Sequence, residues 1–189
     1  HQIWISANTD ALTGLYNRRF FYEYMNENRK ENQLSLLYVD LDDFKKVNDA
    51  HGHHIGDGAL DNVLDAYEKA LHEHPRDDHR HGIVHCQITR ADQLEKIAKM
   101  HLHVYAQSIF LDYDNHIVEE RVGKELASTS YSWKTLMNNG VSVSNGTDCP
   151  VELPDALACM QCAVTRTTLR DHVGPYLPDQ KFTVQEALY

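Results

Sequence analysis

Several features that would assign a function class are missing from this sequence of 189 residues. No apolar run approaches the roughly 20 residues of a membrane-spanning helix, and the N-terminus lacks the layout of a signal peptide. Cationic residues are also in short supply, because 18 Lys and Arg against 28 Asp and Glu give a formal net charge of -10. A surface for nucleic acid or anionic lipid needs positive charge, so we expect neither partner. The sequence predicts a cytoplasmic protein without membrane insertion that acts on a small molecule.

Cysteine is scarce and no other secretory feature accompanies it, which predicts reduced thiols. Two of the cysteines, Cys159 and Cys162, have the CxxC spacing of redox and zinc motifs. They lie in a predicted helix with apolar neighbours and no second CxxC, so the pattern favours buried helical cysteines. The sequence also lacks a nucleophile elbow, a phosphate-binding P-loop and zinc-finger spacing. None of these motifs therefore defines a function for the chain.

What the sequence does contain is enough apolar residues for a core and an unusual number of histidines. An apolar content of 42% predicts a globular chain with one domain or one and a half. Of the 13 histidines, four surround "PRDD" in a predicted loop, where a solvated loop is favoured over an adventitious metal site: His72, His74, His79 and His81.

The first part of the chain predicts a helix, a strand and a cluster of acids. A helical pattern with an apolar face follows Asn17, and "LSLLYVDLDDF" is typical of a buried strand that ends in Asp40, Asp42 and Asp43. A carboxylate at the end of such a strand is a common place to hold a divalent ion and a phosphate. The spacing alone also fits acids that cap a helix beginning near Phe44.

Two longer motifs in this part, "DALTGLYNRRFF" and "VDLDDFKKVNDAHGHHIGD", resemble the first half of a GGDEF domain, the diguanylate cyclase family that joins two GTP molecules into cyclic di-GMP. The resemblance implies that Asp40 is a Mg²⁺ ligand and that Asn48 and Asp57 hydrogen-bond the guanine of GTP. The Gly-Gly-Asp/Glu-Glu-Phe signature never follows, so the second metal carboxylate is missing. Since phosphoryl transfer needs metals that bracket the reacting oxygens, we expect no cyclase activity.

The rest of the chain predicts alternating helices and strands. An amphipathic helix begins near Ala59, and it is followed by strand patterns at "GIVHCQI", "HVYAQSIF" and "GVSVSNGTD", with helical stretches between and after them. This alternation predicts an α/β fold with a parallel sheet. His85 and Asp148 end two of the strands, and such ends converge in a (β/α)₈ barrel. Imidazole and carboxylate suit Zn²⁺ or a similar divalent ion, although a packed strand histidine and a turn-forming aspartate remain alternatives.

Three segments carry a second resemblance: "HHIGDGALDNVLDAYEKALHEHPRDDHRHGIVHCQITRADQL", "STSYSWKTLMNNGVSVSNGTDCPVELPDALACMQCAVTR" and "PDQKFTVQEAL". They are similar to the C-terminal part of the family 3 amidohydrolases, metal-dependent hydrolases of amide and related C–N bonds. The resemblance implies that His53 is the ligand after the fifth barrel strand, His85 the ligand after the sixth, and Asp148 the ligand or general base after the eighth. Val84 stands where the family usually has an acid.

No counterpart of the first four strands of that barrel precedes His53, so its His-x-His pair and its carboxylate or modified lysine are missing. We therefore expect a partial (β/α)₈ barrel whose exposed strand edges favour self-association.

The short segment "GHHIGDGAL" fits both families at once, which predicts a hybrid with a crossover within residues 53–59. Residues 1–57 would be a partial GGDEF-type β/α unit and 58–189 an amidohydrolase-like half-barrel. The leading prediction is a metal-dependent amidohydrolase-like protein with low or no turnover, in which metal-activated water attacks and Asp148 takes the proton. The alternatives are a GGDEF-type module that binds GTP with Mg²⁺, and a chimeric fold without activity.

Overall fold

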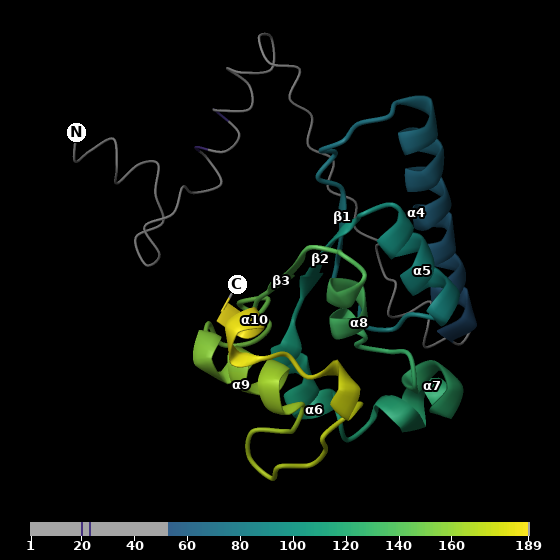
Figure 1. The fold of residues 1–189 in the computed structure, drawn as a ribbon. Coiled ribbons are helices and arrows are strands. Elements are labelled where there is room, and N and C mark those ends of the chain that lie inside the picture. Colours follow the sequence, from purple (N-terminus) through teal and green to yellow (C-terminus); the bar gives the residue numbers. More distant parts are fainter. Residues whose placement is uncertain (1–19, 21–22, 24–52, 189) are drawn as a thin grey trace, which may run out of the picture. The chain divides into compact units, whose positions relative to one another are not determined.

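The structure is a computed structural model that describes residues 20, 23 and 53–188, with the side chains of 53–57 excepted (Figure 1). The long stretch belongs to a compact unit that spans Asp43–Tyr189. Asp40 and Asn48 lie outside the described residues, and so do the side chains of His53 and Asp57. Within the described part, no helix combines the length and the apolar character that a membrane crossing requires.

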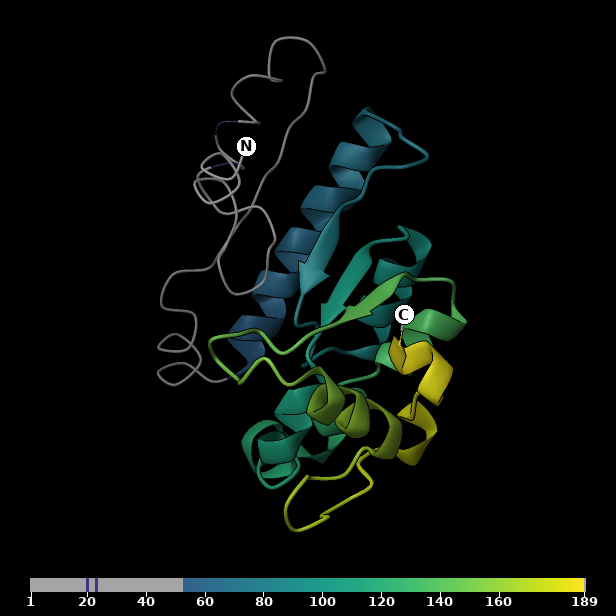
Figure 2. The ribbon, with the colours of Figure 1, turned by 90° about the vertical axis from the view of Figure 1, so that its left-hand side faces the viewer.

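The described part contains a parallel sheet with the strand order β1-β2-β3 (Figure 2). Its strands are β1 (Gly82–Val84), β2 (His103–Ala106) and β3 (Val143–Asn145). Both pairs are parallel, with Ile83 opposite Val104 and Val104 opposite Val143. This arrangement confirms the predicted α/β class with a parallel sheet.

Helices precede, connect and follow the strands. α4 (His53–Glu73) comes before β1, and α5 (Ala91–Lys99) connects β1 to β2. Four helical segments lie between β2 and β3: η1 (Ser108–Phe110), α6 (Leu111–Asp114), α7 (Val118–Ala127) and α8 (Trp133–Asn138). Three more follow β3: α9 (Ala156–Thr165), η2 (Pro178–Gln180) and α10 (Val184–Leu188).

All three predicted strands end earlier than their sequence patterns indicate. The pattern "GIVHCQI" stops being a strand at Val84, because His85 and Cys86 adopt positive φ angles of 68° and 48° that leave the β region. The pattern "HVYAQSIF" ends at Ala106, since its last three residues form the 3₁₀ helix η1. The pattern "GVSVSNGTD" ends as a strand at Asn145, before Asp148. All three corrections concern the carboxyl ends of strands, where the candidate site residues lie.

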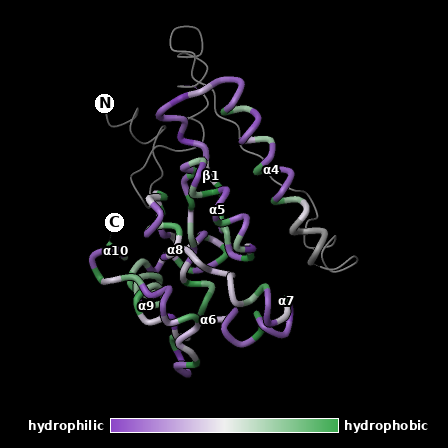
Figure 3. The backbone as a smooth tube through the Cα atoms, turned by 45° about the vertical axis from the view of Figure 1, so that its right-hand side comes forward, coloured by the Kyte–Doolittle hydropathy of each residue, from purple (hydrophilic) through white to green (hydrophobic). Residues whose placement is uncertain are grey.

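Helix α4 packs on the core through the apolar stripe that its sequence predicts. Leu64 is fully buried, and Leu60 and Tyr67 pack against the same core. Hydrophilic and hydrophobic residues are mixed along the helix, as Figure 3 shows. The helix begins at His53 and not near Ala59, so it includes residues of the predicted crossover.

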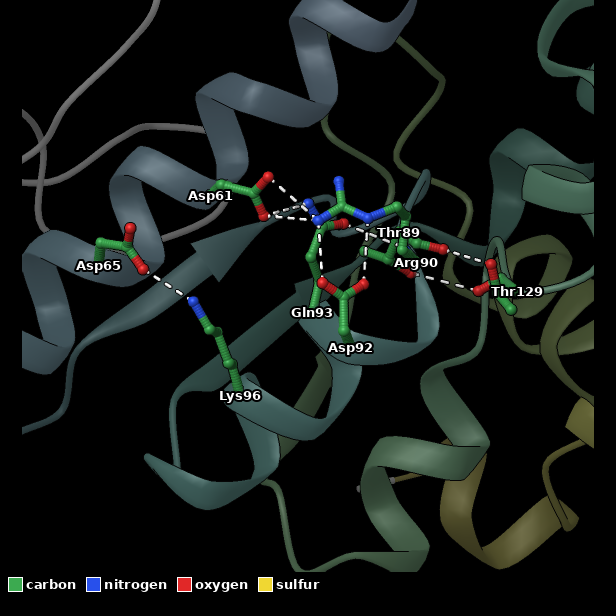
Figure 4. A network of polar contacts seen from close by, with 8 residues as sticks. All are labelled: Asp61, Asp65, Thr89, Arg90, Asp92, Gln93, Lys96 and Thr129. Carbon is green, nitrogen blue, oxygen red and sulfur yellow. Dashed lines mark hydrogen bonds and ion pairs between the residues drawn. The ribbon is translucent and has the colours of Figure 1, made fainter.

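Polar contacts fix α4 to α5 (Figure 4). The Arg90 guanidinium donates through Nη2 to both carboxylate oxygens of Asp61, at 2.8 and 3.0 Å. Gln93 donates to the same carboxylate at 2.9 Å, and Lys96 pairs with Asp65 at 2.8 Å. The first helix of the described stretch is therefore held by both apolar and charged contacts.

The core extends from the sheet into the helices that follow β2. Trp133 and Arg166 are its largest fully buried side chains. Within the described part of the chain, Arg166 donates to backbone carbonyl oxygens, those of Tyr131 and Tyr176, at 3.1 and 2.9 Å. Its guanidinium carbon lies 6.0 Å from the centre of the Trp133 ring and 5.6 Å from that of Tyr176. Both aromatic rings thus lie within cation–π range of the buried guanidinium.

Candidate metal-binding site

The candidate site lies at the carboxyl ends of the three strands. His85 directly follows β1, Gln107 directly follows β2, and Asp148 lies three residues after the end of β3. Because parallel strands end at the same edge of a sheet, this topology brings polar side chains from three separate segments together.

The backbone at His85 is held in a left-handed turn. Its N–H continues the sheet by donating to the Tyr105 carbonyl at 2.9 Å, and its φ of 68° then turns the chain away from β2. The buried Trp133 indole N–H donates to the carbonyl oxygens of His85 and Cys86, each at 3.0 Å. Non-glycine residues adopt this conformation at an energetic cost, which the indole hydrogen bonds help to offset.

The side chains of His85 and Asp148 face one another. The distance from His85 Nε2 to Asp148 Oδ2 is 3.9 Å, and the side chains are 42% and 36% exposed. This distance is too long for a hydrogen bond. Two ligands of one zinc ion, each about 2.1 Å from it, lie about 3.4 Å apart at tetrahedral geometry, so the pair is close to the spacing of shared ligands.

Asp148 itself lies in a tight turn after β3. Its φ is 56°, and its carbonyl accepts the N–H of Val151 at 2.8 Å. Asp148 is therefore a turn-forming aspartate and also lies close to His85, because the same turn carries its carboxylate toward the imidazole. Whether the two residues act as ligands stays a prediction.

Gln107 is a third site residue, which the sequence patterns did not single out. Its Oε1 lies 2.8 Å from His85 Nδ1, and the residue is buried with 6% of its surface exposed. Phe110 borders the same imidazole, with 5.9 Å between the ring centres. The one signal in the sequence is a polar residue directly after the apolar strand "HVYA".

The chain is similar to a family of known proteins over most of its length. A family model described as "Amidohydrolase family" matches residues 45–189. The chain belongs to the amidohydrolase family. YtcJ of Bacillus subtilis (strain 168), an amidohydrolase by name, is 35% identical over 138 residues, which are 72% of this chain and 25% of YtcJ. These matches confirm the amidohydrolase resemblance of the larger part of the sequence.

A solved structure and a second relative complete the comparison. The crystal structure of an uncharacterized metal-dependent hydrolase from Pyrococcus furiosus matches with a TM-score of 0.56 and 30% identity, over 70% of this chain and 25% of that chain. The diguanylate cyclase DgcS of Shewanella oneidensis is 38% identical over 72 residues, 35% of this chain and 24% of DgcS. The chain thus spans about a quarter of the length of each of these proteins.

The side chains of His85 and Asp148 are of the types that bind a divalent ion, but they are only two potential ligands. A neutral imidazole and a carboxylate are typical zinc ligands, and a catalytic zinc usually has three from the protein. Among the residues that the structure describes, no group of three or more His, Cys, Asp or Glu side chains could hold a metal ion. The third predicted ligand, His53, begins α4, and its side chain lies outside the description.

Among the described residues, His79 has other hydrogen-bond partners, and Cys86 and Cys162 are buried thiols. Both ring nitrogens of His79 are engaged, with the Met100 carbonyl at 2.9 Å and the His81 N–H at 3.0 Å. All four cysteines are free thiols, as predicted, and Cys162 is buried in α9. Burial raises the pKa of both Cys162 and Cys86 to about 12, so neither is a thiolate at neutral pH.

Proposed function

We propose that the chain is a metal-dependent amidohydrolase-like protein whose divalent ion, Zn²⁺ or a similar metal, is held by His85, Asp148 and His53. The observation that carries the proposal is the pair of His85 Nε2 and Asp148 Oδ2, 3.9 Å apart at the carboxyl ends of parallel strands. The family match and the likeness to a metal-dependent hydrolase support it.

The substrate in this proposal is a small molecule with an amide or related C–N bond. An ion at the site would polarise the scissile group and make water a nucleophile at neutral pH. Asp148 would accept the proton of the attacking water, since its carboxylate is part exposed and free to reach water. His85 would stay a neutral ligand.

Low or absent turnover is part of the same proposal. The described residues supply two of the donors that a catalytic zinc needs, His85 and Asp148. In this interpretation residues 58–189 form a half-barrel joined to a GGDEF-like fragment, and the open edges of the half-barrel favour self-association.

Zinc binding tests the proposal directly. We expect isothermal titration to show Zn²⁺ binding that is lost in His85→Ala and in Asp148→Asn. The exposed residues His74 and Asp77 provide matched controls, so His74→Ala and Asp77→Asn should bind as the wild type does. At a zinc concentration 100-fold above Kd, the folded state should gain about 2.7 kcal/mol. Equal zinc binding by the wild type and by the two site variants would refute the proposal.

A second candidate is a GGDEF-type module that binds GTP with Mg²⁺, and the similarity to DgcS favours it. In this case Asp40 would hold Mg²⁺, while Asn48 and Asp57 would contact the guanine. Mg²⁺-dependent GTP binding that Asn48→Ala and Asp57→Ala abolish would support this candidate, and no effect of GTP on thermal unfolding would exclude it. A chain that binds neither zinc nor GTP would be a chimeric fold without activity.

A further inference from the structure

We propose that Gln107 is a positioning residue that holds His85 in the tautomer with its proton on Nδ1, which leaves the Nε2 lone pair facing Asp148. The inference rests on the proposed function, because this tautomer is the one that ligates a metal through Nε2. The state of the imidazole itself, however, can be measured without any metal.

A hydrogen bond joins the side chains of Gln107 and His85. Gln107 Oε1 lies 2.8 Å from His85 Nδ1, and an amide oxygen can only accept. Nδ1 must then carry the proton, and in a neutral ring Nε2 must carry the lone pair. Gln107 is 6% exposed, so water competes little for this contact.

On the opposite side of the ring, Nε2 of His85 faces the carboxylate of Asp148. With the other orientation of the amide, Nδ1 would accept and Nε2 would carry the proton toward the Asp148 carboxylate. A donor beside a carboxylate closes to hydrogen-bond distance, whereas Nε2 and Oδ2 are 3.9 Å apart. The separation therefore agrees with a lone pair on Nε2.

The surroundings make Gln107 the polar group that decides the tautomer. Trp133 fixes the His85 backbone through its carbonyl, and the Phe110 ring borders the imidazole without offering a hydrogen bond. An unconstrained neutral imidazole carries its proton mainly on Nε2. Without Gln107, the ring would revert to that tautomer and would have to move its proton before it could bind a metal through Nε2.

Variants at position 107 separate this role from a merely structural one. Gln107→Met keeps the size of the side chain but removes the acceptor, whereas Gln107→Glu keeps an oxygen acceptor for Nδ1. Gln161→Met serves as the matched control, because Gln161 is an exposed glutamine on α9. The tautomer is read from the ¹⁵N chemical shifts of the His85 ring at a pH where it is neutral, with His85→Ala used for assignment.

We expect Nδ1 to be protonated in the wild type, in Gln107→Glu and in Gln161→Met, and the proton to shift to Nε2 in Gln107→Met. Zinc affinity should fall by about 10- to 100-fold in Gln107→Met. A wild-type ring protonated on Nε2, or an unchanged tautomer in Gln107→Met, would overturn the inference. If Gln107→Met fails to fold, the wild type and Gln107→Glu still show whether Nδ1 of His85 carries the proton when an oxygen acceptor stands at position 107.

The two proposals can fail separately. A wild type with the predicted tautomer but without zinc binding would refute the metal site and support the positioning role. A wild type that binds zinc through a ring protonated on Nε2 in the metal-free protein would refute the positioning role alone.

Discussion

Replacing Trp133 by phenylalanine tests how the fold supports the site. Trp133 is fully buried, and its indole N–H serves the carbonyl oxygens of two consecutive residues in the left-handed region, His85 and Cys86. Phenylalanine keeps an aromatic ring in the core but has no donor. The substitution therefore removes the contact that holds the left-handed turn and leaves much of the packing in place.

The expected cost has three parts. The lost hydrogen bond and the unpaired carbonyls cost about 1–2 kcal/mol. The space that the smaller ring leaves costs about 1 kcal/mol, at about 24 cal/mol per Å³ of cavity. Weaker contact with the Arg166 guanidinium, now 6.0 Å from the Trp133 ring, adds about 0.5 kcal/mol. We expect the free energy of unfolding to fall by about 2–4 kcal/mol.

Urea unfolding followed by far-ultraviolet circular dichroism measures this change, because removing a tryptophan alters the fluorescence signal. Tyr113→Phe is the control: Tyr113 is 63% exposed, so its substitution should change stability by less than about 0.5 kcal/mol. Trp133→Phe should also weaken zinc binding, since the His85 turn loosens. A Trp133→Phe variant as stable as Tyr113→Phe would show that the indole N–H does not support the turn.

Two further predictions concern the attachment of α4. Leu64→Ala should lower the free energy of unfolding by about 3–5 kcal/mol, because Leu64 is fully buried. Leu71→Ala, at a half-exposed position of the same helix, should lower it less, and chemical denaturation of the two variants measures the difference. Hydrogen bonds from Gln93 and Arg90 lower the pKa of Asp61 below its ordinary value of 3.8. The stability that these hydrogen bonds contribute is therefore fully present above pH 3.8, and it is lost as the pH falls through the lower pKa of the folded state. Asp61→Asn should remove this acid-sensitive part of the free energy of unfolding, which is about 1 kcal/mol or less for a pair this exposed. If the wild type and Asp61→Asn lose the same stability below pH 3.8, the hydrogen bonds to Asp61 are not its source.

Local patterns predicted much of the fold. The apolar stripe of α4 placed Leu64 in the core, and alternating helices and strands indicated the parallel sheet. The ends of the apolar runs also placed His85 and Asp148 at one edge of that sheet, where the structure brings them within 3.9 Å. These features depend on periodicity and chain order, which a single sequence displays.

The features that the patterns missed depend on distant parts of the chain. The strand at "HVYAQSIF" is cut short where the backbone N–H of Ser108 donates to the side chain of Asn145 and the 3₁₀ helix η1 begins. The left-handed turn at His85 depends on an indole 48 residues away. Gln107 was missed for the same reason, since its contact is with the imidazole of His85, 22 residues earlier in the chain.

The distribution of the thiols gives the molecule a natural reporter. Of the four cysteines, Cys149 is exposed while Cys86, Cys159 and Cys162 are buried. Cys149 directly follows Asp148, so a fluorophore or spin label on this one accessible sulfur would lie beside the site without any engineered mutation. In the folded protein a thiol reagent should modify one cysteine, and after unfolding it should modify all of them. The same chain thus carries a probe of its own folding and a probe of ligand arrival at the Asp148 turn.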